Sequence, residues 1–365
     1  MKVLLAVHHL GSRTGSELYV TELAQSLAER GATVAILTLV RGPLAAQLEA
    51  ETGIRVFGPN DLLGVQRFAP DIVHSHHLTM FHLLGEALPG VPRVRGILGV
   101  VPALEHPPIT ISEASRVFVV SERVGERVLA RAPQLTSVDI VRNWFDERYL
   151  AEVDPFTVPD DRPHRVLVVS DKMSADRDAA LAVLEAEGFV TVTRAGGVHG
   201  HREITGTYLK QFDAVVTIGR TVLLAGAVGV PCLVADQDMS DGLLTHDVVD
   251  KLARKNFTGR EFRHAISADH LRAEILRSKH IDREALARKI RGEYGLSARS
   301  RYFLSVYEDV LRETRDRPLP DPRIRRGEGA VYRELAVRIA HLETELRRTS
   351  DELARQQREP HKPGS

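Results

Sequence analysis

The sequence has little of three things that would narrow its function at once: cysteine, net charge and long apolar runs. Cys232 is the single cysteine in 365 residues, which excludes an intrachain disulfide and suits a reducing compartment. Because it follows Pro231 in an apolar run, we expect it to be a small buried core residue. The 49 basic and 49 acidic residues cancel, so no overall field favours nucleic acid.

No stretch approaches the ~20 consecutive apolar residues that a membrane-spanning helix needs. The apolar run at residues 1–11 is too short for a signal peptide and leads directly into a helical pattern. We therefore expect a cytoplasmic protein with at most peripheral membrane contact. Hydrophobic residues make up 43% of the chain, which is enough for two domains with cores of their own.

What the sequence does have is an alternation of strand and helix patterns that occurs twice. In each half an apolar run is followed by a helical stretch, a closing glycine (Gly31 or Gly188) and a second apolar run. The runs that predict buried parallel strands are 3–7, 33–39, 54–57, 70–74, 93–98, 116–120 and 139–141, then 165–170, 189–193, 213–217 and 231–235. This pattern predicts an α/β protein of two Rossmann-like domains that face each other across a cleft.

Proline and charge patterns suggest where the chain divides. We predict an N-terminal domain over 1–157, a C-terminal domain over 158–315 and a proline-rich linker over 316–329. A helix over 330–358 and a disordered tail over 359–365 complete the chain. The seam of a heptad repeat is formed by Leu335, Ile339, Leu342, Leu346, Thr349 and Leu353. This helix fits self-association, a fold-back onto the second domain, or binding to a different partner helix.

Two glycine-bearing loops enter helices and are candidate anion sites. Residues 11–15 precede the first helix, where Ser16 is a candidate cap. Residues 219–221 open a helix in the second half and include Arg220. Free backbone N–H groups and the helix dipole favour phosphate or carboxylate there, and arginine adds a charged fork. The plainer interpretations are a tight turn for the first loop and an arginine covering the sheet edge for the second.

Histidine is abundant, with 16 residues, and several lie at predicted strand ends. The strand-end histidines are His8, His9, His74, His76 and His77. A parallel sheet can make these ends neighbours, so the imidazoles are candidates for contacting a sugar or phosphate. They are equally consistent with ordinary strand-end histidines. A metal site is the remaining alternative, although the spacing is unlike any standard motif.

Several segments, taken in order, resemble GT-B glycosyltransferases of the family 4 type. The segments that carry the resemblance are 11–17, 27–34, 70–77, 119–122, 141–146 and 213–231, and it covers roughly 1–315. The resemblance implies a first domain that binds an acceptor and a second that binds a nucleotide-sugar donor. It implies no cofactor and no metal, because positive groups of the protein would neutralise the departing diphosphate.

The resemblance also implies roles for individual residues. The donor and phosphate candidates are Gly15, Lys172, Gly219, Arg220, Thr221, Asp241 and Gly242, with Arg177 in reserve for Lys172. The acceptor-side candidates are Gly11, Ser16, Glu17, His76 and His77. His106, in a proline-rich loop, is the candidate catalytic base. Residues 236–238 match a metal-binding D-x-D pattern, but that pattern belongs to a fold with one nucleotide-binding sheet, so we interpret them as a polar loop.

One departure from the family bears on activity. The family usually carries two glutamates eight positions apart, the second of which holds the donor ribose; here the matching residues are Val216 and Leu224. Leucine cannot accept a hydrogen bond. The resemblance nevertheless implies a hexosyltransferase that moves a sugar to a surface polysaccharide or glycoconjugate acceptor. The heptad pattern predicts a homo-oligomer through 330–358. The alternatives are a non-catalytic GT-B protein that serves as a binding or assembly subunit, and a nucleotide-sugar epimerase.

Overall fold

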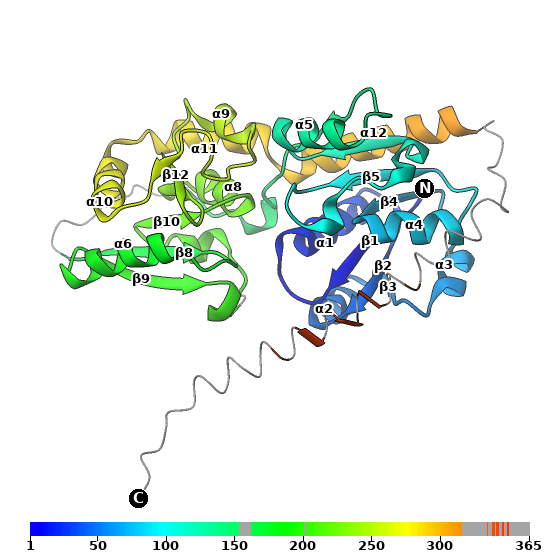
Figure 1. Cartoon of the computed structure of the whole chain (residues 1–365), viewed down its shortest axis with the longest axis horizontal. Helices are drawn as coiled ribbons and strands as arrows, with labels where there is room; N and C mark the ends of the chain where they lie inside the picture. The colour runs from blue at the N-terminus through cyan, green and yellow to red at the C-terminus, as the bar shows by residue number, and fades with distance from the viewer. Residues whose placement is uncertain are drawn as a thin grey trace, which may run out of the picture.

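In a computed structural model the chain folds into two α/β domains, each built on one sheet (Figure 1). The structure describes residues 1–152, 162–200 and 202–315, and eight helical residues between 334 and 349. The predicted domain boundary at 157/158, the linker 316–329 and the tail 359–365 lie outside the described residues. Within the described part of the chain, every helix is too short or too polar to span a bilayer.

The first sheet has seven parallel strands in the order β3-β2-β1-β4-β5-β6-β7. They are β1 (Lys2–Leu10), β2 (Thr33–Arg41), β3 (Arg55–Phe57), β4 (Ile72–His76), β5 (Arg93–Ile97), β6 (Arg116–Val119) and β7 (Asp139–Ile140). Core clusters lie on both faces, so the strands are apolar throughout rather than alternating. The helices are α1 (Gly15–Glu29), α2 (Pro43–Thr52), α3 (Leu62–Phe68), α4 (Leu78–Ala87) and α5 (Glu122–Arg131), with short turns η1 (Ala103–Glu105), η2 (Ile109–Glu113) and η3 (Glu147–Tyr149).

The second sheet has six strands in the order β13-β12-β11-β10-β8-β9, of which β12 and β13 are antiparallel. They are β8 (His164–Val169), β9 (Val190–Ala195), β10 (Ala214–Thr217), β11 (Cys232–Ala235), β12 (Met239–Leu243) and β13 (His264–Ala265). The helices are α6 (Ala175–Ala186), α7 (Gly206–Leu209), α8 (Arg220–Ala227), α9 (Val249–Ala253), α10 (Ala268–Arg277) and α11 (Arg283–Glu293), with turns η4 (Gly197–His199) and η5 (Ser278–His280). Cys232 is fully buried in this core, as the sequence predicts.

One segment of the second domain differs from the sequence prediction. Residues 240–245 are expected to form a loop, whereas Met239–Leu243 form β12, antiparallel to β11. A register irregularity between Val234 and Ala235 lets the pairing continue. Serine, aspartate and glycine favour turns on their own, so pairing with a buried neighbour overrides the local preference here.

Helix α12 (Leu296–Thr314) lies at the end of the described range 202–315. It packs on the first domain, although it follows the second domain in sequence. Phe303, Tyr307 and Val310 are fully buried in the same core cluster as α1 and the first sheet. The chain therefore passes between the domains twice, and Phe145 and Gly295 pair where the two passages meet. Helix α12 contacts α1, and Figure 1 shows it on the side of the first domain, away from the second sheet.

Part of the predicted heptad helix is described. Ile339, Leu342 and Leu346 are helical, and their exposed fractions are 36%, 58% and 70%. Leu335 and Leu353 lie outside the described residues. The apolar side chains of Ile339, Leu342 and Leu346 are therefore exposed to solvent. The expected self-association stays a prediction.

Candidate functional site

A cavity of about 450 Å³ lies between the two domains, at the carboxyl ends of strands from both sheets. In open α/β sheets this is where ligands bind. The predicted site residues that line it are Gly15, Ser16, Lys172, Gly219, Arg220 and Thr221. The predicted residues that do not line it are Gly11, Glu17, His76, His77, His106, Asp241 and Gly242, all of which the structure describes.

The loop before α1 is organised by Glu17, whose side chain is buried. Its carboxylate accepts hydrogen bonds from the backbone N–H groups of Gly11 (3.0 Å) and Thr14 (3.2 Å), and from the Thr14 hydroxyl (2.7 Å). Thr14 and Glu17 thus form a capping box, which places the helix start one residue before the predicted cap Ser16. Glu17 therefore holds the loop in shape, and Gly15 and Ser16 present the helix start to the cavity.

The second domain contributes its own helix start to the cavity. Gly219 precedes α8 with φ of 66°, a conformation that glycine adopts at little cost. Lys172 lies just beyond β8, exposed at the cavity wall. Arg177 is buried and donates to the backbone carbonyl of Lys172 at 3.2 Å, so it supports the loop from behind. The helix start and Lys172 give this wall of the cavity backbone N–H groups and a positive charge, which are groups that can interact with an anion.

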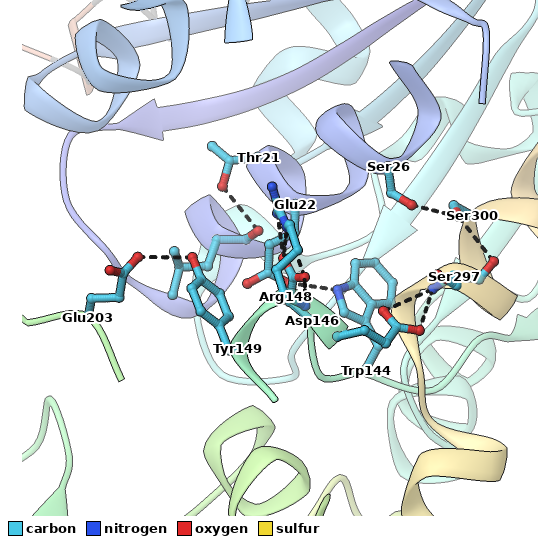
Figure 2. Close-up of polar contacts among 12 residues, drawn as sticks. Thr21, Glu22, Ser26, Trp144, Asp146, Arg148, Tyr149, Glu203, Ser297 and Ser300 are labelled. Atoms are coloured by element: carbon cyan, nitrogen blue, oxygen red, sulfur yellow. Dashed lines mark hydrogen bonds and ion pairs between the residues drawn. The ribbon is translucent and has the colours of Figure 1, made fainter. Parts of the chain in front are cut away.

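Arg220 already has a partner in the cavity. Its guanidinium forms an ion pair with the carboxylate of Glu22, which comes from α1 across the cleft. The Trp144 indole N–H donates to the same Glu22 oxygen at 2.9 Å, and the guanidinium lies 5.6 Å from the Trp144 ring centroid. Figure 2 shows Glu22 and Trp144 facing each other beside the Asp146–Arg148 pair. Burial raises the pKa of Glu22, and the positive charge of Arg220 opposes that rise.

A second ion pair crosses the cleft nearer to solvent. An Arg13 Nη atom lies 2.5 Å from a Glu203 oxygen, and the Tyr149 hydroxyl donates to the same oxygen at 3.0 Å (Figure 2). Glu203 is half exposed, so we expect this pair to contribute little to stability. Two of the arginines that border the cavity, Arg13 and Arg220, are therefore balanced by carboxylates from the opposite domain.

The predicted histidines lie behind the cavity wall. His76 is fully buried and stacks on His74 with ring centroids 4.6 Å apart. His77 has φ of 68°, and its Nδ1 accepts from the His8 backbone N–H at 3.1 Å. Its Nε2 lies 3.6 Å from a Glu105 oxygen. Burial lowers the pKa of both His76 and His77 well below the usual value, so both imidazoles are neutral near pH 7.

Glu105, rather than its neighbour His106, borders the cavity. Its side chain is buried, and one carboxylate oxygen accepts from the Leu98 backbone N–H at 2.9 Å. Burial raises the pKa of Glu105, while nearby Arg95 opposes the rise. His106 lies on the other side of the turn η1, where burial and the charges of Arg131 and Arg127 lower its pKa. Successive residues of a tight turn point in different directions, which is why adjacent positions differ here.

Asp241 and Gly242 belong to β12 and lie away from the cavity. Asp241 accepts from the backbone N–H groups of Glu261 and Phe262, both at 2.7 Å. These bonds connect β12 to the turn before β13. Among the described residues no group of three histidine, cysteine, aspartate or glutamate side chains is arranged to hold a metal ion.

Several charged and aromatic side chains that line the cavity were not singled out from the sequence, and they come from both domains. They include Arg13, Glu22, Glu105, Trp144, Tyr149, Arg202 and Glu203. One signal was available: Glu22 follows Tyr19 by three positions and lies on the buried face of an amphipathic helix. A carboxylate at such a position needs a partner, but the sequence does not say that the partner is Arg220.

Comparison with known proteins identifies the fold. A scan against protein-family models finds no match, and a search of curated proteins finds none. Among solved structures, the chain is similar to a glycosyltransferase from Rickettsia africae ESF-5, with a TM-score of 0.59, 15% identity, and coverage of 85% of this chain and 98% of that one. It is also similar to the apo form of the lipopolysaccharide outer core galactosyltransferase WaaB, with a TM-score of 0.53, 12% identity and coverage of 85% and 100%.

A third similar structure has a different activity in its name. The UDP-GlcNAc 2-epimerase from Neisseria meningitidis, bound to UDP-GlcNAc, gives a TM-score of 0.50 at 11% identity, covering 84% of this chain and 99% of that one. Identities this low establish the architecture alone. The chain has the GT-B fold: two Rossmann-like domains with a cavity between them, as the sequence predicts.

Proposed function

We propose that the chain is a GT-B glycosyltransferase of the family 4 type that moves a hexosyl group from a nucleotide-sugar to a surface polysaccharide or glycoconjugate acceptor. The observation that carries the proposal is a set of positive and N–H groups on the second-domain side of the interdomain cavity. These groups are Lys172, Arg220 and the α8 start at Gly219. These groups supply the positive charge that a departing diphosphate requires. The proposal therefore needs no metal and no further cofactor.

The acceptor would bind on the side of the first domain, near Gly15 and Ser16. In this proposal Glu105 takes the acid–base role that the sequence suggested for His106, because its carboxyl borders the cavity. Burial raises the pKa of Glu105 above its ordinary value, and a shift in this direction suits proton transfer to or from a hydroxyl. The names of the similar structures, a galactosyltransferase and an epimerase bound to UDP-GlcNAc, support a nucleotide-sugar as the ligand.

The direct test is nucleotide binding. We expect one member of a panel of UDP, GDP, ADP and dTDP to raise the melting temperature, because a ligand of the folded state stabilises it. Arg220→Ala should weaken that binding about ten- to a hundredfold, since it removes a charge-assisted hydrogen bond. Arg116→Ala is the matched control: its partner Glu313 lies 2.6 Å away, outside the cavity. Absence of binding, or equal binding by Arg220→Ala and the native protein, would contradict the proposal.

A second candidate is a non-catalytic GT-B protein that binds a ligand or assembles with an active partner. The observation that favours it is the apolar character of the two positions that match the glutamates of family 4-type enzymes: Leu224 of α8 borders the cavity, and Val216 of β10 is buried in the sheet core. Incubation with nucleotide-sugars separates the candidates. A transferase releases free nucleoside diphosphate, an epimerase yields an isomeric nucleotide-sugar, and a non-catalytic protein binds without turnover.

A further inference from the structure

The ion pair between Glu22 and Arg220 has an unusual position for a structural contact. It is buried, with side chains 6% and 17% exposed, and it joins α1 of one domain to α8 of the other at the cavity wall. The partners are 198 positions apart in sequence. A buried pair of this kind carries a large desolvation cost and is seldom retained for stability alone.

The guanidinium of Arg220 is only partly satisfied by its neighbours. Nη2 donates to Glu22, and Nε lies 3.4 Å from the Trp144 carbonyl oxygen. Nη1 is buried and has no hydrogen-bond partner among the described residues. An orphaned donor on a buried arginine costs free energy unless an acceptor arrives. The arginine thus retains hydrogen-bonding capacity that a second anion would use.

Glu22 is in turn held in place by the first domain. Its carboxylate accepts from the Trp144 indole N–H at 2.9 Å, and Trp144 is fully buried against Tyr19 with ring centroids 4.0 Å apart. The negative charge of Asp146 adds to the burial that raises the pKa of Glu22. The Glu22 carboxylate is thus an anion held in a fixed position, and it contacts Arg220 from the first-domain side of the cavity.

We propose that Glu22 is a built-in competitor for the donor diphosphate. Its carboxylate occupies Arg220 in the ligand-free protein, and a bound nucleotide must exchange for it. A diphosphate carries more charge and more acceptor oxygens than a carboxylate, so it reaches both Nη1 and Nη2 of a guanidinium fork. The inference rests on the proposed function, because it assumes that the ligand of Arg220 is a diphosphate. Its consequence is that Glu22 lowers donor affinity, although it lies inside the binding cavity.

The experiment is a double-mutant cycle read by calorimetric titration with pyrophosphate and with UDP, GDP, ADP and dTDP. Glu22→Gln keeps the shape of the side chain, and its amide oxygen can still accept from the Trp144 indole N–H. We expect it to bind pyrophosphate or the preferred nucleotide at least about fivefold more tightly than the native protein. In an Arg220→Ala background the same change should have little effect.

Glu122→Gln is the control, since Glu122 pairs with Arg142 (2.8 Å) outside the cavity. Glu22→Asp, which shortens the reach toward Arg220, is a second variant in case the amide disturbs folding, and it should also tighten binding. Unchanged or weaker binding by both Glu22 variants, with the native protein binding normally, overturns the inference and leaves the proposed function standing. Equal tightening without Arg220 overturns it too, because Glu22 would then act by repulsion alone. If no variant binds any probe, the proposed function fails as well.

Discussion

Gly96, on β5, lies where two stacked imidazoles leave no room for a side chain. A Cβ added there would come within 2.4 Å of His76 Cε1 and 2.9 Å of His74 Nε2. We predict that Gly96→Ala lowers the free energy of unfolding by about 1–3 kcal/mol through overpacking. Urea denaturation measures this directly.

The matched control for this substitution is Gly292→Ala. Gly292 is exposed within α11, and an added Cβ would meet no atom within 4 Å. Alanine there should raise the free energy of unfolding by about 0.4–1 kcal/mol. Equal effects at the two positions would show that packing around His76 does not require glycine.

Leu224 allows a prediction about the donor ribose. It borders the cavity on α8, at the position that matches a glutamate of the family 4-type glycosyltransferases that the sequence resembles. We predict that Leu224→Glu tightens binding of the preferred ribonucleoside diphosphate by roughly three- to tenfold, through one charged hydrogen bond. The 2′-deoxy analogue should gain less, because it offers one hydroxyl fewer, and Leu224→Met should leave both affinities unchanged. A weaker or equal affinity for the ribonucleotide means that the ribose lies elsewhere.

For single residues, the sequence predicts those whose role depends on local secondary structure. It misses those whose role depends on a partner far away in the sequence. Gly15, Gly219 and Lys172 border the cavity because each lies next to a strand end or a helix start, and both are readable from local patterns. The pairing of Glu22 with Arg220 depends on how two domains meet. No local pattern contains that information.

Among the secondary-structure elements, the loop before α1 depends on one side chain. Glu17 accepts hydrogen bonds from Gly11, Ser12 and Thr14, and the loop leads into the helix start at the cavity. We predict that Glu17→Ala lowers the free energy of unfolding by about 1–2 kcal/mol and speeds amide exchange across residues 11–15. Glu29→Ala, at the exposed far end of α1, should change neither. Unchanged exchange in the Glu17 variant would mean that the loop keeps its shape without the carboxylate.

The parallel strands are well predicted because burial on both faces makes them apolar along their whole length. β12 is not, since Ser240, Asp241 and Gly242 look like a turn and become a strand only by pairing with β11. Helix α12 buries Phe303, Tyr307 and Val310 in the core of the first domain. An amphipathic pattern can reveal such a buried face but not the domain that buries it.

For the whole molecule, the buried histidines make stability depend on pH. Burial lowers the pKa of His74 to about 3, and the pKa values of His76 and His77 are lowered as well. In the unfolded chain these groups take up protons near pH 6.5. Stability is therefore fully present above pH 6.5 and is lost as the pH falls from 6.5 toward 3. The loss approaches about 1.4 kcal/mol per histidine and pH unit.

Urea denaturation between pH 8 and pH 5 checks this dependence. The buried carboxyls of Glu22 and Glu105 act in the opposite direction, because burial raises their pKa values: what they contribute is present in acid and lost as the pH rises. Above pH 5 we expect the histidines to dominate the pH dependence of the free energy of unfolding, because three of them take up protons over the same pH range in the unfolded chain. A flat profile between pH 7 and pH 5 would contradict a neutral histidine core.

Oligomerisation is a second prediction for the whole molecule. Ile339, Leu342 and Leu346 are helical and exposed, and their positions follow heptad spacing. Such a seam is buried when helices associate. We predict that the full chain sediments as a dimer or larger at micromolar concentration, and that a chain ending at Arg317 is a monomer with unchanged nucleotide affinity. Leu342→Asp in the full chain should act like the truncation. A full-length monomer would rule out self-association and leave two alternatives: a helix folded back onto the second domain, or a foreign partner helix.

The double passage of the chain between domains has a consequence for synthesis on the ribosome. The first sheet is made early, but its core includes Phe303, Tyr307 and Val310 of α12, which are translated after the entire second domain. Until then the surface that α12 will cover stays open beside α1. Domains generally fold in the order in which they emerge, whereas here the domain that emerges first is completed last. We therefore expect the apolar face of the first domain to stay exposed to solvent until α12 has been translated.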